Sequence, residues 1–170
     1  MGKRSNYSRR ILDSYATPFS AVAPLLLHLG SGICFDEPCA GDRALVSHLT
    51  RHGHQCARAS DIADEHPVDA FNLERSGADM FITNPPWDWD VLDPLIDHLS
   101  NMKPTWLLLN ADLMHNKRMG RHMRRCLKVV SIGRIKWIEG SKSTGMENCA
   151  WFLFVGREVQ TLFYGREWRI

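Results

Sequence analysis

The alternation of short apolar runs with amphipathic helical patterns limits the fold of this chain more than any other sequence feature. Strand formers occur at 33–35, 55–60, 79–83 and 105–111, and helical patterns occupy 43–53 and 90–102. Parallel strands need helical crossovers of this kind, and strands covered on both faces are almost continuously apolar. We therefore predict an α/β fold with a doubly wound, mostly parallel sheet.

The ends of the chain add further elements to this prediction. Thr17 is expected to cap a helix that has Pro18 in its first position and runs toward Leu29. A basic helix is expected at 116–128. Two apolar runs at 129–138 and 148–156 have no helical pattern between them. They predict an antiparallel hairpin at the edge of the sheet, and hence an antiparallel strand near the C-terminus.

Composition places the chain among ordinary soluble proteins. It has 170 residues, 44% hydrophobic and 24% charged, which fits one catalytic domain spanning 1–170. The longest apolar run, at 21–29, is too short to cross a membrane, and no signal-peptide core follows the first residues. We expect a cytoplasmic protein that binds no membrane. Five scattered cysteines argue against disulfides and zinc, and we predict no metal although His48, His52 and His54 could share one helix end.

Charge is segregated along the sequence. Residues 13–100 hold fourteen acidic and four basic residues, whereas 101–170 hold thirteen basic and five acidic ones. No acid lies between Asp112 and Glu139. Such segregation favours a polyanionic partner on the basic part, although a solvated basic helix is an alternative on charge alone.

Polar motifs follow three of the predicted strands: DEPCAGD at 36–42, SD at 60–61 and NPPW at 84–87. Ligands of open α/β sheets bind beyond the carboxyl ends of the strands, so the motifs are expected to converge. Asp61, 20 residues after Gly41, could accept bonds from ribose hydroxyls. Because G-x-G-x-x-G is missing and Asp36 and Glu37 would repel a pyrophosphate, we predict a cationic nucleoside such as S-adenosylmethionine.

These motifs, with YATP at 15–18 and DAF at 69–71, resemble in their order the amino-methyltransferases. The resemblance is strongest to the phage-type DNA N6-adenine methyltransferases and covers nearly the whole chain. It implies a Rossmann-like methyltransferase sheet and S-adenosylmethionine-dependent methyl transfer to the N6 amine of adenine in DNA. One departure is Arg43, which stands where the family usually has a glycine.

The resemblance also implies roles for individual residues. Tyr15, Thr17 and Pro18 would border the methionine end of the cofactor, Glu37 and Asp69 its amino group, Asp61 its ribose and Ile62 its adenine. Helix capping explains Asp69 nearly as well. The turn residues Pro38, Cys39, Ala40 and Gly41, together with Phe71 and Asn84, complete the expected cofactor site.

The chemistry of an aryl amine explains the NPPW stretch. Pro85 and Pro86 must end the strand at Asn84 because proline lacks an amide hydrogen. The Asn84 side-chain oxygen and the Pro85 carbonyl could then accept the two N–H groups of the amine and aim its lone pair. Trp87 would stack on a base flipped out of the duplex. An ordinary turn with a core tryptophan is the structural alternative for these residues.

The target and its partners are less narrowly defined by the sequence. Asn-Pro-Pro-aromatic sequences also occur in enzymes that methylate RNA adenine or guanine amines or a glutamine amide. We expect DNA rather than RNA, relaxed sequence specificity, no separate target-recognition domain, and a bacterial or phage-infected cell as the setting. A non-catalytic binding subunit, a homodimer and a partner subunit remain open alternatives. We expect six basic residues to contact nucleic-acid phosphates: Lys117, Arg118, Arg121, Arg124, Arg125 and Lys142.

Overall fold

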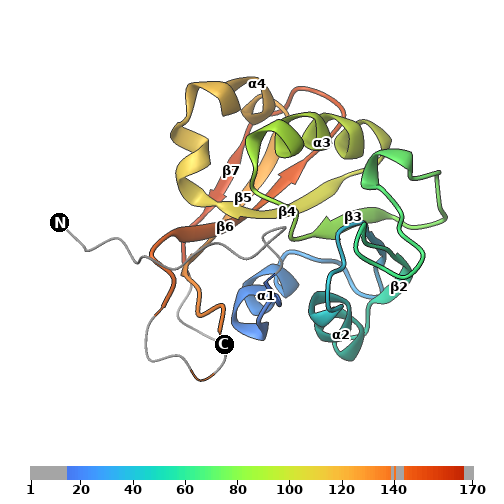
Figure 1. The fold of residues 1–170 in the computed structure, drawn as a ribbon. Helices are drawn as coiled ribbons and strands as arrows, with labels where there is room; N and C mark the ends of the chain where they lie inside the picture. The colour runs from blue at the N-terminus through green and yellow to red at the C-terminus, as the bar shows by residue number, and fades with distance from the viewer. Residues whose placement is uncertain (1–14, 139, 141–143, 167–170) are drawn as a thin grey trace.

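The structure is a computed structural model, and it describes residues 15–138, 140 and 144–166. Strands and helices alternate through most of this length (Figure 1). In chain order the elements, with η marking 3₁₀ helices, are α1 (Phe19–Leu26), β1 (Cys34–Glu37), α2 (Ala44–Arg51), β2 (Gln55–Ala59), η2 (Ala70–Asn72), β3 (Met80–Thr83), α3 (Trp89–Met102), β4 (Thr105–Asn110), η3 (Ala111–His115), η4 (Lys117–Met119), α4 (Gly120–Met123), β5 (Cys126–Arg134), β6 (Asn148–Phe154) and β7 (Leu162–Tyr164).

The strands form a seven-stranded sheet in the order β2-β1-β3-β4-β6-β5-β7. Strands β2, β1, β3 and β4 pair in parallel, as do β5 and β7, whereas β6 is antiparallel to both of its neighbours. The chain goes from β1 outward to β2 and then returns to β3 on the other side of β1. This reversal between β1 and β3 is the switch point at which α/β sheets bind ligands.

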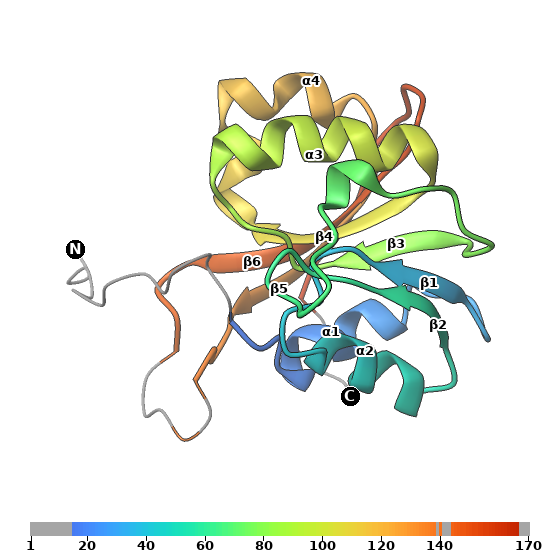
Figure 2. The ribbon, with the colours of Figure 1, turned by 45° about the vertical axis from the view of Figure 1, so that its right-hand side comes forward.

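Helices cover both faces of the sheet. Helices α1 and α2 lie on one face, and α3 and α4 lie on the other (Figure 2). Alternate residues of the central strands therefore enter two separate apolar clusters. Trp106 of β4 packs with Leu25 and Leu45 under α1 and α2, whereas its neighbour Leu107 packs with Leu99 under α3. Burial on both faces explains why the central strands read as continuous apolar runs.

This architecture confirms the predicted α/β, Rossmann-like, doubly wound sheet, mostly parallel with an antiparallel strand near the C-terminus. The expected hairpin is also present, since β5 and β6 pair antiparallel from Cys126↔Phe154 to Arg134↔Asn148. The prediction that this hairpin forms the edge of the sheet is wrong. Strand β7 lies outside β5 and pairs with it in parallel. It has only three residues, too few for a periodic signal.

The first helix begins one residue later than predicted. Pro18 is the N-cap, and its extended φ and ψ of −73° and 154° precede a helix that starts at Phe19. No side chain in the described part of the chain caps this helix. The predicted Thr17 cap is wrong because the Thr17 hydroxyl accepts a hydrogen bond from Asn84 Nδ2 at 3.3 Å. Its tertiary partner therefore replaces the local one.

The long basic helix predicted at 116–128 is also wrong. Only Gly120–Met123 is α-helical, after the short η4, and β5 already begins at Cys126. The Asn116 side chain caps η4 by accepting from the Arg118 amide, at 3.0 Å. Beyond it, Cys126 and Val129 are buried against β6 and α3. Sheet pairing therefore overrides the helical pattern of the sequence, as tertiary context commonly does.

Within the described residues, no helix is long and apolar enough to span a membrane.

Candidate active site

A cavity of about 260 Å³ opens at the switch point of the sheet. Its walls come from the turn after β1, the loop after β2 and the residues that follow β3. The structure brings together there most of the residues expected at the cofactor site: Tyr15, Thr17, Glu37, Pro38, Cys39, Ala40, Gly41, Asp61, Ile62, Asp69, Phe71 and Asn84, together with Pro86. Pro18, Pro85 and Trp87 lie outside the cavity lining.

Several lining residues were not anticipated from the sequence. Val91 and Leu95 come from the first turns of α3, and Leu45 comes from α2. The remaining ones are Asp42, Ala63, Asp64, Val68 and Ala70. Their positions in the two loops next to predicted residues are the only sequence signal that could have found them. The helix residues show no such signal, because they look like ordinary members of an apolar helix face.

The cavity is strongly acidic. Among the described residues that line it, five are carboxylates and none is Lys, Arg or His. These acids are Glu37, Asp42, Asp61, Asp64 and Asp69. Asp36, which lies in β1 beside Glu37, does not line the cavity and pairs with Arg58 at 3.2 Å and Lys103 at 3.8 Å, so the prediction that it would repel a pyrophosphate there is wrong. An unbalanced set of carboxylates favours a cationic ligand and disfavours a phosphate.

Glu37 is the least satisfied of these acids. It is 2% exposed, and its Oε2 atom has no hydrogen-bond partner in the described part of the chain. Burial, together with the nearby Asp42 and Asp61 charges, holds the pKa of Glu37 well above its usual value of 4.5. A buried carboxyl without a partner is unfavourable in the empty site. A cation bound beside it would relieve this cost.

Asp61 is held rigidly by backbone amides. Its two carboxylate oxygens accept from the Gly41 amide at 2.8 Å and from the Ala63 amide at 2.9 Å. Each oxygen retains a second lone pair with which it can accept a ligand hydroxyl. The same bond to Gly41 joins the turn after β1 to the loop after β2, so the separation of 20 residues read from the sequence corresponds to a direct contact.

Asp69 has a local structural role. One of its oxygens accepts from the Phe71 amide at 3.0 Å, so the side chain caps η2. Helix capping, the alternative considered from the sequence, therefore accounts for this geometry. Its carboxylate still lines the cavity.

The Asn84 amide is oriented by Thr17. Because Nδ2 donates to the Thr17 hydroxyl at 3.3 Å, the side-chain oxygen is left as an acceptor. Asn84 is half-buried at the end of β3, and Pro85 behind it is buried. The two prolines cannot continue the ladder, so the chain turns at the cavity wall, where Asn84 and Pro86 both lie.

Trp87 is anchored to the sheet and to a second tryptophan. Its Nε1 donates to the Leu108 carbonyl of β4 at 3.0 Å. The ring meets Trp137 edge to face, with centroids 6.0 Å apart, and Trp137 in turn contacts Tyr15. The indole is half-buried against both apolar clusters. An aromatic group built from three distant segments therefore stands behind the Asn-Pro-Pro turn.

The cysteine at the cavity is not an activated nucleophile. Burial raises the pKa of Cys39 to about 12, and the nearby Asp61 and Glu37 charges act in the same direction. The thiol therefore stays protonated at neutral pH, whereas covalent catalysis requires a thiolate. This argues against a covalent mechanism at Cys39.

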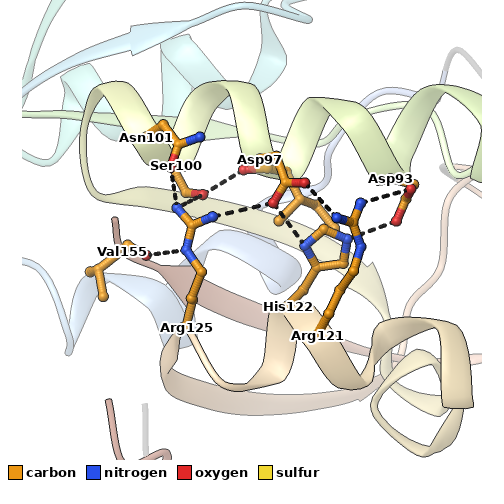
Figure 3. Close-up of polar contacts among 9 residues, drawn as sticks. Asp93, Asp97, Ser100, Asn101, Arg121, His122, Arg125 and Val155 are labelled. Carbon is orange, nitrogen blue, oxygen red and sulfur yellow. Dashed lines mark hydrogen bonds and ion pairs between the residues drawn. The ribbon is translucent and has the colours of Figure 1, made fainter. Parts of the chain in front are cut away.

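The arginines expected to grip phosphates are largely committed to α3 (Figure 3). Arg121 forms ion pairs with Asp93 at 2.8 Å and Asp97 at 2.9 Å. Arg125 donates to Asp97 at 3.2 Å, to Ser100 and Asn101, and to the Val155 carbonyl. Both guanidinium groups are therefore already paired with acids on α3, although Arg121 remains 56% exposed, and their contact with phosphates stays a prediction.

The other members of the predicted basic set differ from one another. Arg124 makes a loose, solvent-exposed pair with Glu158 at 3.9 Å and no other ion pair among the described residues. Lys117 and Arg118 are exposed and have no acidic partner among the described residues. Lys142 lies outside the described residues.

No protein-family model and no curated protein matches this chain. Solved structures do match. A protein from Listeria monocytogenes described as a class I S-adenosylmethionine-dependent methyltransferase superposes with a TM-score of 0.53 and 8% identity, over 86% of this chain and 64% of its own. The methyltransferase subunit of a type I restriction-modification system from Streptococcus thermophilus gives 0.53 and 9%, over 89% and 47%. A protein from Pyrococcus horikoshii described as an RNA methyltransferase gives 0.53 and 14%, over 87% and 89%.

This chain has the class I methyltransferase fold. At these identities the likeness concerns the fold alone. The chain also spans less than two thirds of the Listeria protein and about half of the Streptococcus subunit. In a class I methyltransferase fold the cavity at the β1–β3 switch point corresponds to the ligand crevice of α/β sheets, which is where the acidic residues and the Asn-Pro-Pro turn meet.

Proposed function

We propose that this protein is an S-adenosylmethionine-dependent methyltransferase acting on the exocyclic N6 amine of adenine in DNA. The observation that carries the proposal is a cavity at the switch point whose charged lining residues, among those described, are all acids, and which ends at the Asn84-Pro85-Pro86 turn. The acidic lining fits a cationic nucleoside. The Asn-Pro-Pro turn fits an amine whose nitrogen must become pyramidal.

The cavity residues match the groups of S-adenosylmethionine. Asp61, fixed by the Gly41 and Ala63 amides, would accept from the ribose hydroxyls. Glu37, buried with a free oxygen, would receive the ammonium group. The exposed apolar side chain of Ile62, 60% accessible at the cavity, would cover the adenine. When bound, S-adenosylmethionine supplies a methyl group on a positively charged sulfur.

The Asn-Pro-Pro turn would hold the target amine. The Asn84 oxygen and the Pro85 carbonyl accept its two N–H groups, which favours a pyramidal nitrogen with a directed lone pair. Thr17 fixes the Asn84 amide in the required orientation. No strong base is needed, because the proton leaves an amine that is already cationic and can pass to water. Positioning then supplies much of the rate. Trp87 and its aromatic neighbours would form the wall on which the flipped base stacks.

Nucleic acid is the favoured substrate class because exposed cations share the edge of the sheet with the cavity. Lys117 and Arg118 follow the carboxyl end of β4, and Arg134 and Lys136 lie at the carboxyl end of β5. Both ends lie on the side of the molecule where β3 leads into α3 (Figure 2). These exposed residues could contact phosphates on either side of a base at Asn84.

The choice of adenine in DNA rests on the resemblance of the sequence motifs. A type I restriction-modification subunit among the similar folds is compatible with it. The similar fold described as an RNA methyltransferase keeps RNA adenine or guanine as the alternative substrate. We further propose that residues 1–170 act as one catalytic unit with relaxed sequence specificity. This unit is compatible with association into a homodimer or with a partner subunit.

A radiochemical methyl-transfer assay tests the proposal. The purified protein is incubated with tritiated S-adenosylmethionine and separate pools of DNA, RNA and protein, and the product nucleosides are identified. We expect N6-methyladenine from DNA. Asn84→Ala should lose about 100-fold or more of the rate, by analogy with other positioned polar groups. Asn72→Ala, which removes an exposed asparagine from η2, is the matched control and should keep full activity.

Label in RNA nucleosides or in glutamine would redirect the proposal to those substrates. Specific cofactor binding without transfer to any pool would instead favour a non-catalytic subunit. Full activity of Asn84→Ala would exclude the proposed role of the turn.

A further inference from the structure

Arg43 has a backbone conformation that arginine disfavours. It is the only non-glycine residue in the described ranges with a positive φ, at 63°, and it stands as the N-cap of α2. The turn imposes this conformation, because the Arg43 amide donates to the Ala40 carbonyl at 2.7 Å while its carbonyl accepts from Ser47 at 3.0 Å. Glycine would adopt this conformation without a steric penalty. The arginine side chain therefore calls for an explanation other than backbone geometry.

The guanidinium of Arg43 spans two loops of the cavity. Its Nη2 atom lies 3.1 Å from Asp64 Oδ2. The same Asp64 oxygen accepts from the Asp61 amide at 3.0 Å, and Asp61 in turn accepts from the Gly41 amide. Arg43, Asp64, Asp61 and Gly41 thus form a closed circuit between the turn after β1 and the loop after β2. Arg43 itself does not line the cavity.

Stability alone does not account for this circuit. The side chains of Arg43 and Asp64 are 54% and 25% exposed, and exposed pairs of this kind contribute little to folding. Such a contribution does not compensate for the disfavoured φ. The pair does, however, place a positive charge beside the acidic cavity. Among the described residues, Arg43 is the only cation with an ion pair to a lining carboxylate.

We propose that Arg43 is a positioning residue for the cofactor, and that it acts through Asp64 on Asp61. It holds the two loops at the separation that a bound nucleoside needs and keeps the Asp61 carboxylate aimed at the ribose. This inference rests on the proposed function. It also explains why arginine stands here instead of glycine. The arginine has an unfavourable backbone conformation, but it positions the loops that bind the cofactor.

The test compares cofactor affinity with stability in the same variants. Calorimetric titration with S-adenosylmethionine and thermal melts are carried out on the wild-type chain, Arg43→Gly, Asp64→Asn and the double variant. Arg43→Gly should melt at the same or a higher temperature, because the backbone is relieved, yet bind the cofactor about 5- to 10-fold more weakly. Asp64→Asn should weaken binding similarly, and the double variant should be no weaker than either single one.

Two controls separate positioning from a general effect of charge or folding. Arg43→Lys retains the charge and should recover part of the affinity. Arg51→Ala removes an exposed arginine from the same helix and should leave affinity unchanged. Unchanged affinity in Arg43→Gly, or additive losses in the double variant, would overturn the positioning role while leaving the proposed function intact. If the wild-type chain itself binds no S-adenosylmethionine, both inferences fail.

Discussion

Glu37 shows how a single residue can oppose stability in the empty site. Its pKa is raised by burial and by Asp42 and Asp61, so the folded chain binds a proton more readily than the unfolded chain. The contribution of Glu37 to the free energy of unfolding is therefore highest when the pH is below 4.5, the usual pKa of the side chain. It falls as the pH rises from there through the folded-state pKa. Above that range the ionised side chain is buried without a partner for Oε2 among the described residues.

Replacing Glu37 with glutamine should therefore stabilise the cofactor-free protein at neutral pH. The gain should shrink as pH falls, because the protonated glutamate is also uncharged. Each kcal/mol of difference would shift the melting midpoint by about 2–4 °C in a domain of this size. Thermal melts of both proteins across this pH range measure the effect. Equal midpoints at every pH would mean that folding does not raise the pKa of Glu37.

The same substitution should have the opposite effect on the cofactor. A bound ammonium favours the ionised carboxylate, so the wild-type affinity for S-adenosylmethionine should rise with pH through the folded-state pKa. Glu37→Gln should bind more weakly and lose this pH dependence. Calorimetry in buffers of different ionisation enthalpy would detect the proton released by the wild-type chain. If the affinity of Glu37→Gln for S-adenosylmethionine still depended on pH, another titrating group would be responsible.

At the scale of elements, a network of ion pairs and hydrogen bonds holds α3 against the segment around α4. His122 is 1% exposed and lies 2.8 Å from Asp93. Burial acts to raise the pKa of Asp93, but the hydrogen bonds from His122 and Arg121 outweigh it and hold this pKa below its usual value of 3.8. Arg125 joins α3 to the carbonyl of Val155, just beyond β6. Charges read from the sequence as a binding surface thus connect secondary structure elements.

Arg125→Ala should destabilise the fold by about 1.5–3 kcal/mol, since it removes charge-assisted bonds and takes a donor from the buried Ser100 and the half-buried Asp97 and Val155. Arg118→Ala removes an exposed arginine without an acidic partner in the described ranges and is expected to change stability by less than about 0.5 kcal/mol. Denaturant unfolding of both variants gives the comparison. Similar losses in the two would show that the network adds nothing beyond an ordinary surface arginine.

At the scale of the whole molecule, the distribution of charge sets how the substrate is approached. Among the described residues, the charged members of the cavity lining are all acids, whereas exposed cations lie at the ends of β4 and β5 on the same edge of the sheet. In the proposed function, a phosphate backbone would be repelled from the cofactor site and attracted to its rim. This division allows one face to hold a cationic nucleoside and a polyanion together.

Binding to duplex DNA should weaken steeply as salt increases. The double variant Lys117→Ala/Arg118→Ala should reduce both the affinity and the salt slope, by about 0.9 for each phosphate that these side chains neutralise. Arg125→Ala, assayed under conditions where it is folded, should leave the slope unchanged. Fluorescence anisotropy with a labelled duplex between about 50 and 200 mM salt measures these slopes. An unchanged slope in the double variant would place the phosphate-binding residues elsewhere.

The sequence by itself determined the parallel part of the sheet, the β5–β6 hairpin and many, but not all, of the residues around the cavity. Strand formers such as Phe81 and Ile82 are buried on both faces, so their apolar character directly reports the sheet. Motifs that follow parallel strands must meet at one edge, which is why Glu37, Asp61 and Asn84 could be placed together without coordinates. These inferences depend only on local pattern and on the geometry of parallel sheets.

The tertiary structure alone decided which partner each polar side chain takes. Thr17 bonds to Asn84 instead of capping its helix, and Arg121 pairs with acids on α3 instead of remaining free. Cys126 pairs with Phe154 of β6 although it continues a helical pattern. Each outcome depends on a group 28 or more residues away in sequence. A pattern within one segment carries no record of such a partner, because the interaction exists only once the chain has folded.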